Sequence, residues 1–216
     1  DVCFPISQTP SRPSSLVFSP DGRWLAAGLE NGRAVGWRAG QYNRLAFELA
    51  GESGAIYSLA FSPDSTLLAG GDFSNIYLWQ FAGDKPEPLP QVRIEAHDQA
   101  VRALDFTLDG KYLLSAGGDG ILRVWTVKTG KLYRTMYGHK TQIFTAGYSP
   151  SSADEGYGGL IVSASMDGRL RLWMASNGSF LREFQAHDAA IWCAVFSPDG
   201  RTLLTGGDQR IKLWNL

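Results

Sequence analysis

Tryptophans that end short hydrophobic runs recur along this chain at a nearly constant spacing. They are Trp37, Trp79, Trp125, Trp173 and Trp214, separated by 42, 46, 48 and 41 residues. A period of roughly 40–50 residues is typical of repeat architectures in which each unit is one small supersecondary structure. The spacing therefore predicts a series of similar units, each of which must pack against its neighbours to bury its apolar side chains.

The composition favours strands joined by tight turns. The 216 residues include 25 Gly and 10 Pro, and 12% of them are aromatic. Glycine and proline are turn formers, whereas aromatic residues are enriched in strands. With 44% hydrophobic and 19% charged residues, the chain has the composition of a globular protein and not of a disordered one. An all-β fold is expected.

The charge balance bears on the kind of partner. Twenty basic residues against 21 acidic residues give a formal net charge of -1. The chain lacks the positive excess that phosphate backbones or anionic lipid surfaces attract, so neither nucleic acid nor a membrane is expected as a partner. No apolar run approaches the about 18 residues of a membrane span, and no signal stretch opens the chain. A cytoplasmic location is the expectation, and the absence of an initiator Met indicates a mature product or a segment of a longer protein.

Each repeat contains signals for four strands. An apolar segment ending in an aromatic residue begins 23 to 30 residues before the later tryptophans: Ile56 to Phe61, Val101 to Phe106, Ile143 to Tyr148 and Ile191 to Phe196, with Leu16 to Phe18 as a shorter version. A turn such as Ser-Pro-Asp-Gly at 19–22 and 197–200 follows, then a second strand, and the third strand ends in the Trp. More polar fourth strands are predicted at 45–49, 91–95, 132–137 and 180–184. Val2 to Ile6 is predicted to supply the outer strand that the last repeat lacks.

Three repeats carry the same four polar residue types in register. They are His97, Ser115, Asp119 and Trp125; His139, Ser163, Asp167 and Trp173; and His187, Thr205, Asp208 and Trp214. In this pattern the chain resembles the WD-repeat β-propellers over residues 14 to 216. The resemblance implies four-stranded blades near 14–50, 54–95, 97–137, 139–184 and 187–216, the last completed by 1–6. They form one domain over 1–216, either a closed five-blade ring or part of a larger propeller, for example one of seven blades.

In that family such sets form a hydrogen-bonded chain from Trp through Ser or Thr and His to Asp. His, Ser and Asp are also the residue types of a hydrolytic triad, but an enzyme needs one such site and this chain has three. A structural role is therefore predicted. The first two repeats depart from the pattern: Asn31 replaces the Asp, Ala27 and Ala69 replace the hydroxyl, and Asp72 is displaced by one residue. Those two blades are expected to depend on apolar packing and to be less rigid.

The resemblance also points to a binding face. WD-repeat proteins commonly hold peptides at the top of the propeller, with side chains at the entrance of each inner strand. The matching residues here are Tyr57, Arg102, Phe144 and Trp192, with Ser14 the nearest match in the first repeat. Aromatic and arginine side chains dominate binding hot spots, although these could instead pack between blades as core. Met166, just before a turn Asp, is a further apolar candidate, and Tyr157 lies in an insertion at 150–159.

These features predict a non-catalytic scaffold for protein–protein interaction, acting as a module of a larger signalling or assembly protein. Proteins, peptides or other domains of the same parent chain are the expected partners, and no cofactor or metal is expected. The alternative is a propeller hydrolase or lactonase with a metal ion in its channel. That function requires inward Asp, Glu, Asn or His from several blades, whereas the entrance positions carry Tyr, Arg, Phe and Trp.

Overall fold

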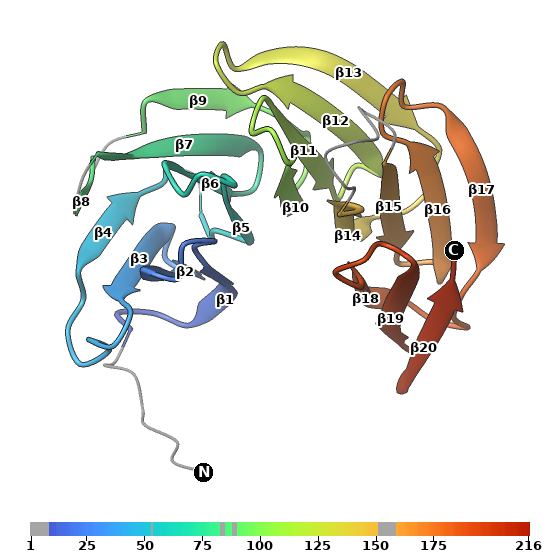
Figure 1. The fold of residues 1–216 in the computed structure, drawn as a ribbon, viewed down its shortest axis with the longest axis horizontal. Helices are drawn as coiled ribbons and strands as arrows, with labels where there is room; N and C mark the ends of the chain where they lie inside the picture. The colour runs from blue at the N-terminus through green and yellow to red at the C-terminus, as the bar shows by residue number, and fades with distance from the viewer. Residues whose placement is uncertain (1–8, 53, 83–84, 88–89, 151–158) are drawn as a thin grey trace. The chain divides into compact units, whose positions relative to one another are not determined.

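The computed structural model describes residues 9–52, 54–82, 85–87, 90–150 and 159–216. Within these residues every regular element is a strand, and every recorded strand pair is antiparallel. The strands form five successive sheets, here called blades 1 to 5, which confirms the predicted fold class (Figure 1). Val2 to Ile6 and the insertion around Tyr157 lie outside the described residues.

The chain divides into two compact units, Asp1–Glu95 and Ala96–Leu216. The first contains blades 1 and 2. Blade 1 consists of β1 (Pro13–Phe18), β2 (Trp24–Leu29), β3 (Arg33–Arg38) and β4 (Phe47–Ala50). Blade 2 consists of β5 (Ser58–Phe61), β6 (Leu67–Gly71), β7 (Asn75–Ala82) and β9 (Val92–Glu95), and the short β8 (Lys85–Pro86) pairs with the end of β7.

The second unit contains blades 3 to 5. Blade 3 consists of β10 (Val101–Phe106), β11 (Tyr112–Gly117), β12 (Ile121–Thr126) and β13 (Lys131–Tyr137). Blade 4 consists of β14 (Ile143–Tyr148), β15 (Leu160–Ser165), β16 (Arg169–Met174) and β17 (Phe180–Gln185). Blade 5 has the three strands β18 (Ile191–Phe196), β19 (Thr202–Gly207) and β20 (Arg210–Asn215) among the described residues.

Apolar packing between successive blades forms the core of the second unit. We call the face of a blade toward the preceding blade its leading face, and the opposite one its trailing face. The trailing face of blade 3 packs on the leading face of blade 4 through Leu114, Leu122, Val124, Ile143, Ile161 and Trp173. Blades 4 and 5 repeat this arrangement through Val162, Leu170, Leu172, Ile191 and Leu203. Blade 4 therefore has two apolar faces, and both take part in the core of this unit.

Aromatic rings hold the first unit together. Trp24 and Phe47 of blade 1 meet Phe81 of blade 2 in edge-to-face contacts with ring centroids 5.2–5.8 Å apart. Phe61 adds a fourth ring, 5.4 Å from Phe81. The Phe47 ring lies against Gly36, where a Cβ atom would be 2.0 Å from it. Apolar packing is thus extensive in this unit, and the lower rigidity expected of its two blades stays a prediction.

The hairpin between the first two strands of each blade uses the same side-chain chemistry. Ser19 Oγ accepts a hydrogen bond from the Trp24 amide at 2.9 Å and donates to Asp21 at 2.6 Å, while Gly22 takes a positive φ of 70°. Blade 4 keeps part of this turn despite its insertion, because Ser149 Oγ accepts from the Leu160 amide at 2.8 Å. The strand register therefore continues across the insertion.

One carboxylate links two blades of the second unit. Asp105 on β10 accepts a hydrogen bond from the backbone amide of Tyr148 on β14 at 2.7 Å. Burial raises the pKa of Asp105 to about 6, although hydrogen bonds from the Tyr148 and Phe106 amides favour the ionised form. The ionised form is thus less favourable in the folded chain than in the unfolded chain, where the pKa is about 4.

We expect stability to fall as the pH rises from about 4 to about 6, because Asp105 ionises first in the unfolded state. Asp105→Asn keeps an acceptor for the Tyr148 amide but carries no charge. Above pH 6 the variant is expected to be more stable by about 1–3 kcal/mol, measured by urea unfolding at several pH values. Asp98→Asn removes an exposed carboxylate of the same blade and serves as the control. Identical pH profiles for Asp105→Asn and the wild type would contradict this assignment.

Candidate functional site

In four of the five blades the inner strand, which is the first strand of the blade, contains one extra residue directly after its first residue. In blades 1, 3, 4 and 5 the register between the first and second strands shifts directly after a residue that starts the inner strand. The residues inserted by these β-bulges are Ser14, Arg102, Phe144 and Trp192. A bulge redirects a side chain away from the ordinary alternation of the strand. Three residues that the sequence predicted for the binding face, Arg102, Phe144 and Trp192, are therefore bulge residues, whereas no bulge is recorded at Tyr57.

Three of these side chains, from blades 3, 4 and 5, lie in a row. The Arg102 guanidinium carbon is 5.9 Å from the centroid of the Phe144 ring. Phe144 in turn stacks on Trp192, with ring centroids 4.6 Å apart and an interplanar angle of 26°. Arg102 and Phe144 are half-buried, whereas Trp192 is 64% exposed. We call this arrangement the Arg102–Phe144–Trp192 stack.

Met166 lies at the same end of blade 4 as Phe144. Its backbone amide donates to the carbonyl of Gln142, two residues before Phe144, at 2.9 Å. This bond ties the turn between β15 and β16 to the loop that leads into β14. The Met166 side chain is exposed at this end of the blade.

The two corresponding residues of the first unit behave differently from one another. Tyr57 is half-buried directly before β5, and its amide donates to the Gly71 carbonyl at 2.8 Å. Its grouping with the other entrance residues stays a prediction. Ser14 Oγ donates to the carbonyls of Gly28 and Ile56 and so ties blade 1 to blade 2. Its hydroxyl group serves the fold of its own unit.

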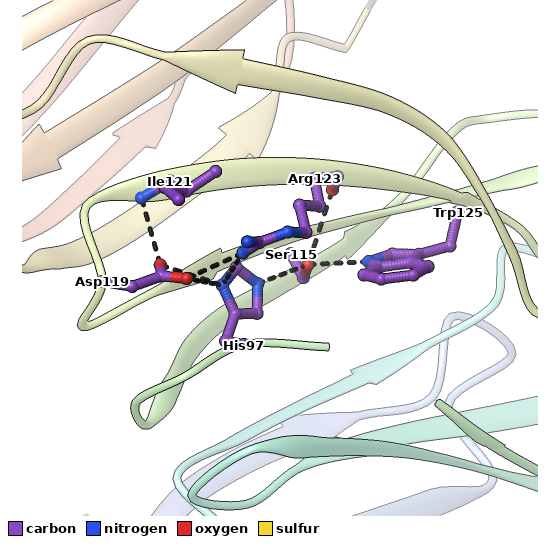
Figure 2. A network of polar contacts seen from close by, with 6 residues as sticks. All are labelled: His97, Ser115, Asp119, Ile121, Arg123 and Trp125. Atoms are coloured by element: carbon purple, nitrogen blue, oxygen red, sulfur yellow. Dashed lines mark hydrogen bonds and ion pairs between the residues drawn. The ribbon is translucent and has the colours of Figure 1, made fainter. Parts of the chain in front are cut away.

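In blade 3 the structure connects the four predicted polar residues completely (Figure 2). Trp125 Nε1 donates to Ser115 Oγ at 2.8 Å, and Ser115 Oγ lies 2.8 Å from His97 Nε2. His97 Nδ1 lies 3.0 Å from Asp119 Oδ1, and because a carboxylate only accepts, the ring N–H is the donor of this contact. Arg123 also donates to Asp119, at 2.8 Å. Burial opposes ionisation of Asp119, but the bonds from His97 and Arg123 outweigh it and lower its pKa to about 2.

Blade 5 shows the same chain of bonds. Trp214 Nε1 donates to Thr205 Oγ1 at 2.9 Å, and Thr205 Oγ1 lies 2.9 Å from His187 Nε2. His187 Nδ1 lies 2.6 Å from Asp208 Oδ1. The hydrogen bond from the His187 ring is the first of the interactions that lower the pKa of Asp208. The loop that precedes the inner strand is thus fixed to the third strand through the second.

In blade 4 the chain of bonds stops at the histidine. Trp173 Nε1 donates to Ser163 Oγ at 2.9 Å, and Ser163 Oγ lies 2.7 Å from His139 Nε2. His139 Nδ1 is buried and has no hydrogen-bond partner among the described residues. Burial, followed by the nearby positive charge of Arg171, lowers the pKa of His139 to about 4. The structure therefore does not bring Asp167 to His139, contrary to the bond that the family pattern implies.

A single residue accounts for this difference. Ser165 Oγ donates to Asp167 Oδ1 at 2.6 Å and holds that carboxylate away from the imidazole. The same strand position is Gly117 in blade 3, where a Cβ atom would lie 2.4 Å from His97 Nδ1. In blade 5 it is Gly207, where a Cβ atom would lie 3.0 Å from the His187 ring. Glycine leaves room for the His-to-Asp contact, and serine occupies that room with a competing donor.

Blade 2 replaces the missing histidine with a tyrosine that the sequence analysis did not identify. Tyr77 is fully buried on β7, and its hydroxyl donates to Asp72 Oδ2 at 2.6 Å. The hydroxyl oxygen of Tyr77 also accepts a hydrogen bond, at 3.0 Å, from the backbone amide of Glu52 in the loop that precedes the blade. Burial and the hydrogen bond to Asp72 raise the pKa of Tyr77 to about 12. Tyr77 thus joins the turn, the third strand and the leading loop.

The register also corrects one sequence alignment. Trp79 lies opposite Leu68, so the position equivalent to Ser115 is Gly70 and not Ala69. The Trp79 ring occupies the space above Gly70, since a Cβ atom there would lie 2.5 Å from the ring. Trp79 Nε1 is buried without a hydrogen-bond partner in the described part of the chain. Blade 2 therefore gains packing from the indole ring but lacks the hydroxyl acceptor of the other blades.

Two absences concern the described residues alone. No three His, Cys, Asp or Glu side chains among them converge closely enough to hold a metal ion. The same residues include no helix long and apolar enough to cross a membrane.

Comparison with known proteins gives one family. The pattern described as "WD40: WD domain, G-beta repeat" matches residues 7–38, 43–80, 89–126, 130–174 and 178–215. Human apoptotic protease-activating factor 1 is 37% identical over 108 residues, which cover 48% of this chain and 8% of that protein. Protein groucho of Drosophila melanogaster is 30% identical over 139 residues, covering 63% of this chain and 18% of that protein. The chain thus spans a small part of the length of both relatives.

Ser165→Gly is expected to release Asp167 so that it accepts from His139 Nδ1. A carboxylate bonded to the ring favours the imidazolium, so the pKa of His139 should rise by about 1 unit or more. An NMR titration of the three histidines measures this shift, with His97 and His187 as internal references. The reciprocal Gly117→Ser should destabilise blade 3, because its Cβ meets the His97 ring. An unchanged His139 pKa in folded Ser165→Gly would show that Ser165 does not divert Asp167.

Tyr77→Phe removes the hydroxyl that both Asp72 and the Glu52 amide contact. Loss of these buried hydrogen bonds should lower the free energy of unfolding by about 1–3 kcal/mol. Urea unfolding measures the effect, and Tyr133→Phe, at an exposed position of β13, controls for the loss of a hydroxyl. Equal stability of the two variants would exclude Tyr77 as a structural equivalent of the histidines.

Proposed function

The chain belongs to the WD-repeat family, and on that premise we propose that it is a non-catalytic scaffold that binds a protein or peptide at the Arg102–Phe144–Trp192 stack. WD repeats and the WD-repeat relatives support a protein-interaction role in general. The observation that carries the finer proposal is the exposed Trp192 ring, backed on one side by Phe144. A large aromatic ring held in place by a neighbour offers contact area at a low entropic cost.

The positions of the stack residues suit recognition of a partner. They come from three consecutive blades, and each is the inserted residue of a bulge, so the strands below hold the spacing of the side chains. Arg102 brings a positive charge to one end of the stack, and Met166 adds an adaptable apolar side chain near Phe144. Tyr57 occupies the matching entrance of blade 2, and we include it as a candidate contact from the first unit.

The polar sets support the non-catalytic part of the proposal. Ser115, Ser163 and Thr205 are fully buried, and each accepts a hydrogen bond from a Trp indole. A nucleophilic hydroxyl must be reached by its substrate, whereas these hydroxyls lie between a tryptophan and a histidine inside the blade. Repetition in three blades agrees with a structural task.

The proposal extends to the setting of the chain. We place it in the cytoplasm as one module of a larger signalling or assembly protein, with proteins rather than nucleic acid or membrane as partners. The exposed free thiol of Cys193 is consistent with a reducing compartment, and both relatives are much longer than the matched segment.

Trp192→Ala is expected to weaken binding of the specific partner by about 30-fold or more, as for a hot-spot residue. A pull-down with the wild type and the variant identifies the proteins that the variant loses, and titration of a recovered partner gives the ratio of dissociation constants. Phe180→Ala removes an exposed aromatic side chain from outer strand β17 and is the matched control.

Phe144→Ala and Arg102→Ala should weaken the same partner less, because both side chains are half-buried and act partly by supporting Trp192. Circular dichroism establishes that each variant is folded before binding is compared. If folded Trp192→Ala retains every partner that Phe180→Ala retains, the binding surface lies elsewhere and the proposal is wrong.

A further inference from the structure

The outer strands of blades 3 and 4 carry large apolar side chains that are exposed. These strands, β13 and β17, each lie at the edge of their sheet (Figure 1). Leu132 and Tyr133 on β13 are 51% and 52% exposed, and Phe180 and Leu181 on β17 are 53% and 44% exposed. We call these four residues the outer-strand surface.

One backbone irregularity underlies both pairs of apolar residues. The register between the third and fourth strands shifts in each of the two blades, and Tyr133 and Leu181 are the extra residues of these β-bulges. A bulge interrupts the alternation of side chains along a strand. Two consecutive apolar residues, the bulge residue and the one before it, are therefore exposed in each outer strand.

The fold does not require apolar residues at these positions. The outer strand of blade 1 exposes Glu48, and the outer strand of blade 2 exposes Arg93 and Glu95. The recorded registers of these two strands with their third strands contain no shift. Because blades of the same chain form with charged residues on the outer strand, the apolar pairs of blades 3 and 4 serve another purpose. Exposed apolar patches with a polar rim mark interaction sites.

Arg134 joins the two apolar pairs into one surface. Its guanidinium group donates to the carbonyls of Ala175 and Ser176 at 3.3 and 3.1 Å, in the turn that leads into Phe180. The guanidinium carbon of Arg134 also lies 5.0 Å from the centroid of the Tyr133 ring. The side chain that connects blade 3 to the turn of blade 4 thus also packs on the exposed aromatic residue of blade 3.

Neighbouring rings hold the two aromatic side chains of this surface in place. Tyr133 packs on Tyr112, with ring centroids 4.6 Å apart. Phe180 makes an edge-to-face contact with the buried Trp173, with ring centroids 5.7 Å apart. A partner that binds rings already fixed in position loses little side-chain entropy at this surface.

The rim of the outer-strand surface is positively charged. Residues 127–137 and 175–182 contain no Asp or Glu. The basic residues of these two stretches are Lys128, Lys131, Arg134 and Arg182. Glu183, the next residue in the chain, is in ion pairs with Arg169 and Arg171. Since the whole chain has a formal net charge of -1, this concentration of positive charge is local and favours an acidic partner.

We propose that the outer-strand surface binds an acidic peptide segment of another protein, in which apolar side chains lie between Asp or Glu residues. The apolar side chains of the segment contact Tyr133 and Phe180, and its carboxylates pair with the basic rim. This surface lies on outer strands, whereas the Arg102–Phe144–Trp192 stack lies on inner strands. The chain therefore has two separate binding surfaces, and this proposal does not depend on the stack.

Selection from a random peptide display library tests the chemistry of the partner. Peptides that bind the wild-type chain are tested again on Tyr133→Ser, Phe180→Ser and Trp192→Ala. We expect a group of peptides that bind Trp192→Ala but neither serine variant, with an excess of Asp and Glu next to Leu, Phe or Trp. Tyr133 and Phe180 are exposed, so both serine variants are expected to fold. Leu132→Ser and Leu181→Ser replace either one if circular dichroism shows it to be unfolded.

A synthetic peptide from this group tests the role of charge by fluorescence anisotropy. Lys131→Glu is expected to weaken its binding by about 10-fold or more, and added salt should weaken binding to the wild type. Lys140→Glu makes the same charge change at an exposed position in the loop that leads into β14, and should bind like the wild type.

Three results would overturn the proposal. The first is that no selected peptide is lost in the serine variants, and the second is that the lost peptides have no excess of acidic residues. The third is that phosphatidylserine vesicles bind the wild type but not the serine variants while no such peptide is found, which would assign the surface to an anionic membrane.

Discussion

The sheets of this chain bury their apolar side chains by packing against neighbouring sheets of the same unit, and the other features of the structure depend on that packing. A blade is only one sheet thick, so it cannot bury its own side chains. The first residue of the inner strand anchors the contacts within the second unit, because Ile143 and Ile191 are fully buried between blades 3 and 4 and between blades 4 and 5. The bulge follows directly, and the next residue is displaced from the strand ladder. The positions available for recognition are thus a consequence of how the blades pack.

Hydrogen bonds within each blade add to the apolar packing between blades. The differences among blades 2 to 5 show which of these hydrogen bonds is common to all four blades. Blades 3 and 5 join the turn Asp to a buried His, blade 2 joins it to Tyr77, and blade 4 joins it to Ser165. In each case the carboxylate accepts a hydrogen bond from a side chain, although the donor and its strand differ. The common physical demand is that a partly buried carboxylate be satisfied, and the His is one of several ways to meet it.

The sequence predicted the repeat, the strands and the polar types in three blades because these follow from periodicity and residue identity. The sequence did not predict the alignment in blade 2, because the segment from Leu68 to its partner Trp79 is one residue shorter than the segment from Leu113 to Trp125 in blade 3. The predicted hydrogen bond between His139 and Asp167 was also wrong, because Ser165 donates a hydrogen bond to the Asp167 carboxylate. The loss of the His139–Asp167 bond depends on a serine side chain at position 165, where blades 3 and 5 have Gly117 and Gly207. The difference between serine and glycine is visible in the sequence, but its effect on the histidine follows only from the distances in the structure.

Comparison of the repeats with one another also separates structural from functional positions. The anchor position of the inner strand is Ile or Val in four blades, because a β-branched side chain fills the space between sheets. The next position is Ser14, Tyr57, Arg102, Phe144 or Trp192, five different residues in five repeats. If packing between the blades required one side-chain shape at this position, the repeats would share one residue type. The shape of the core therefore does not determine the residue at this position. In blades 3 to 5 the unlike residues at this position form one continuous stack, whose spacing is held by the like strands beneath it.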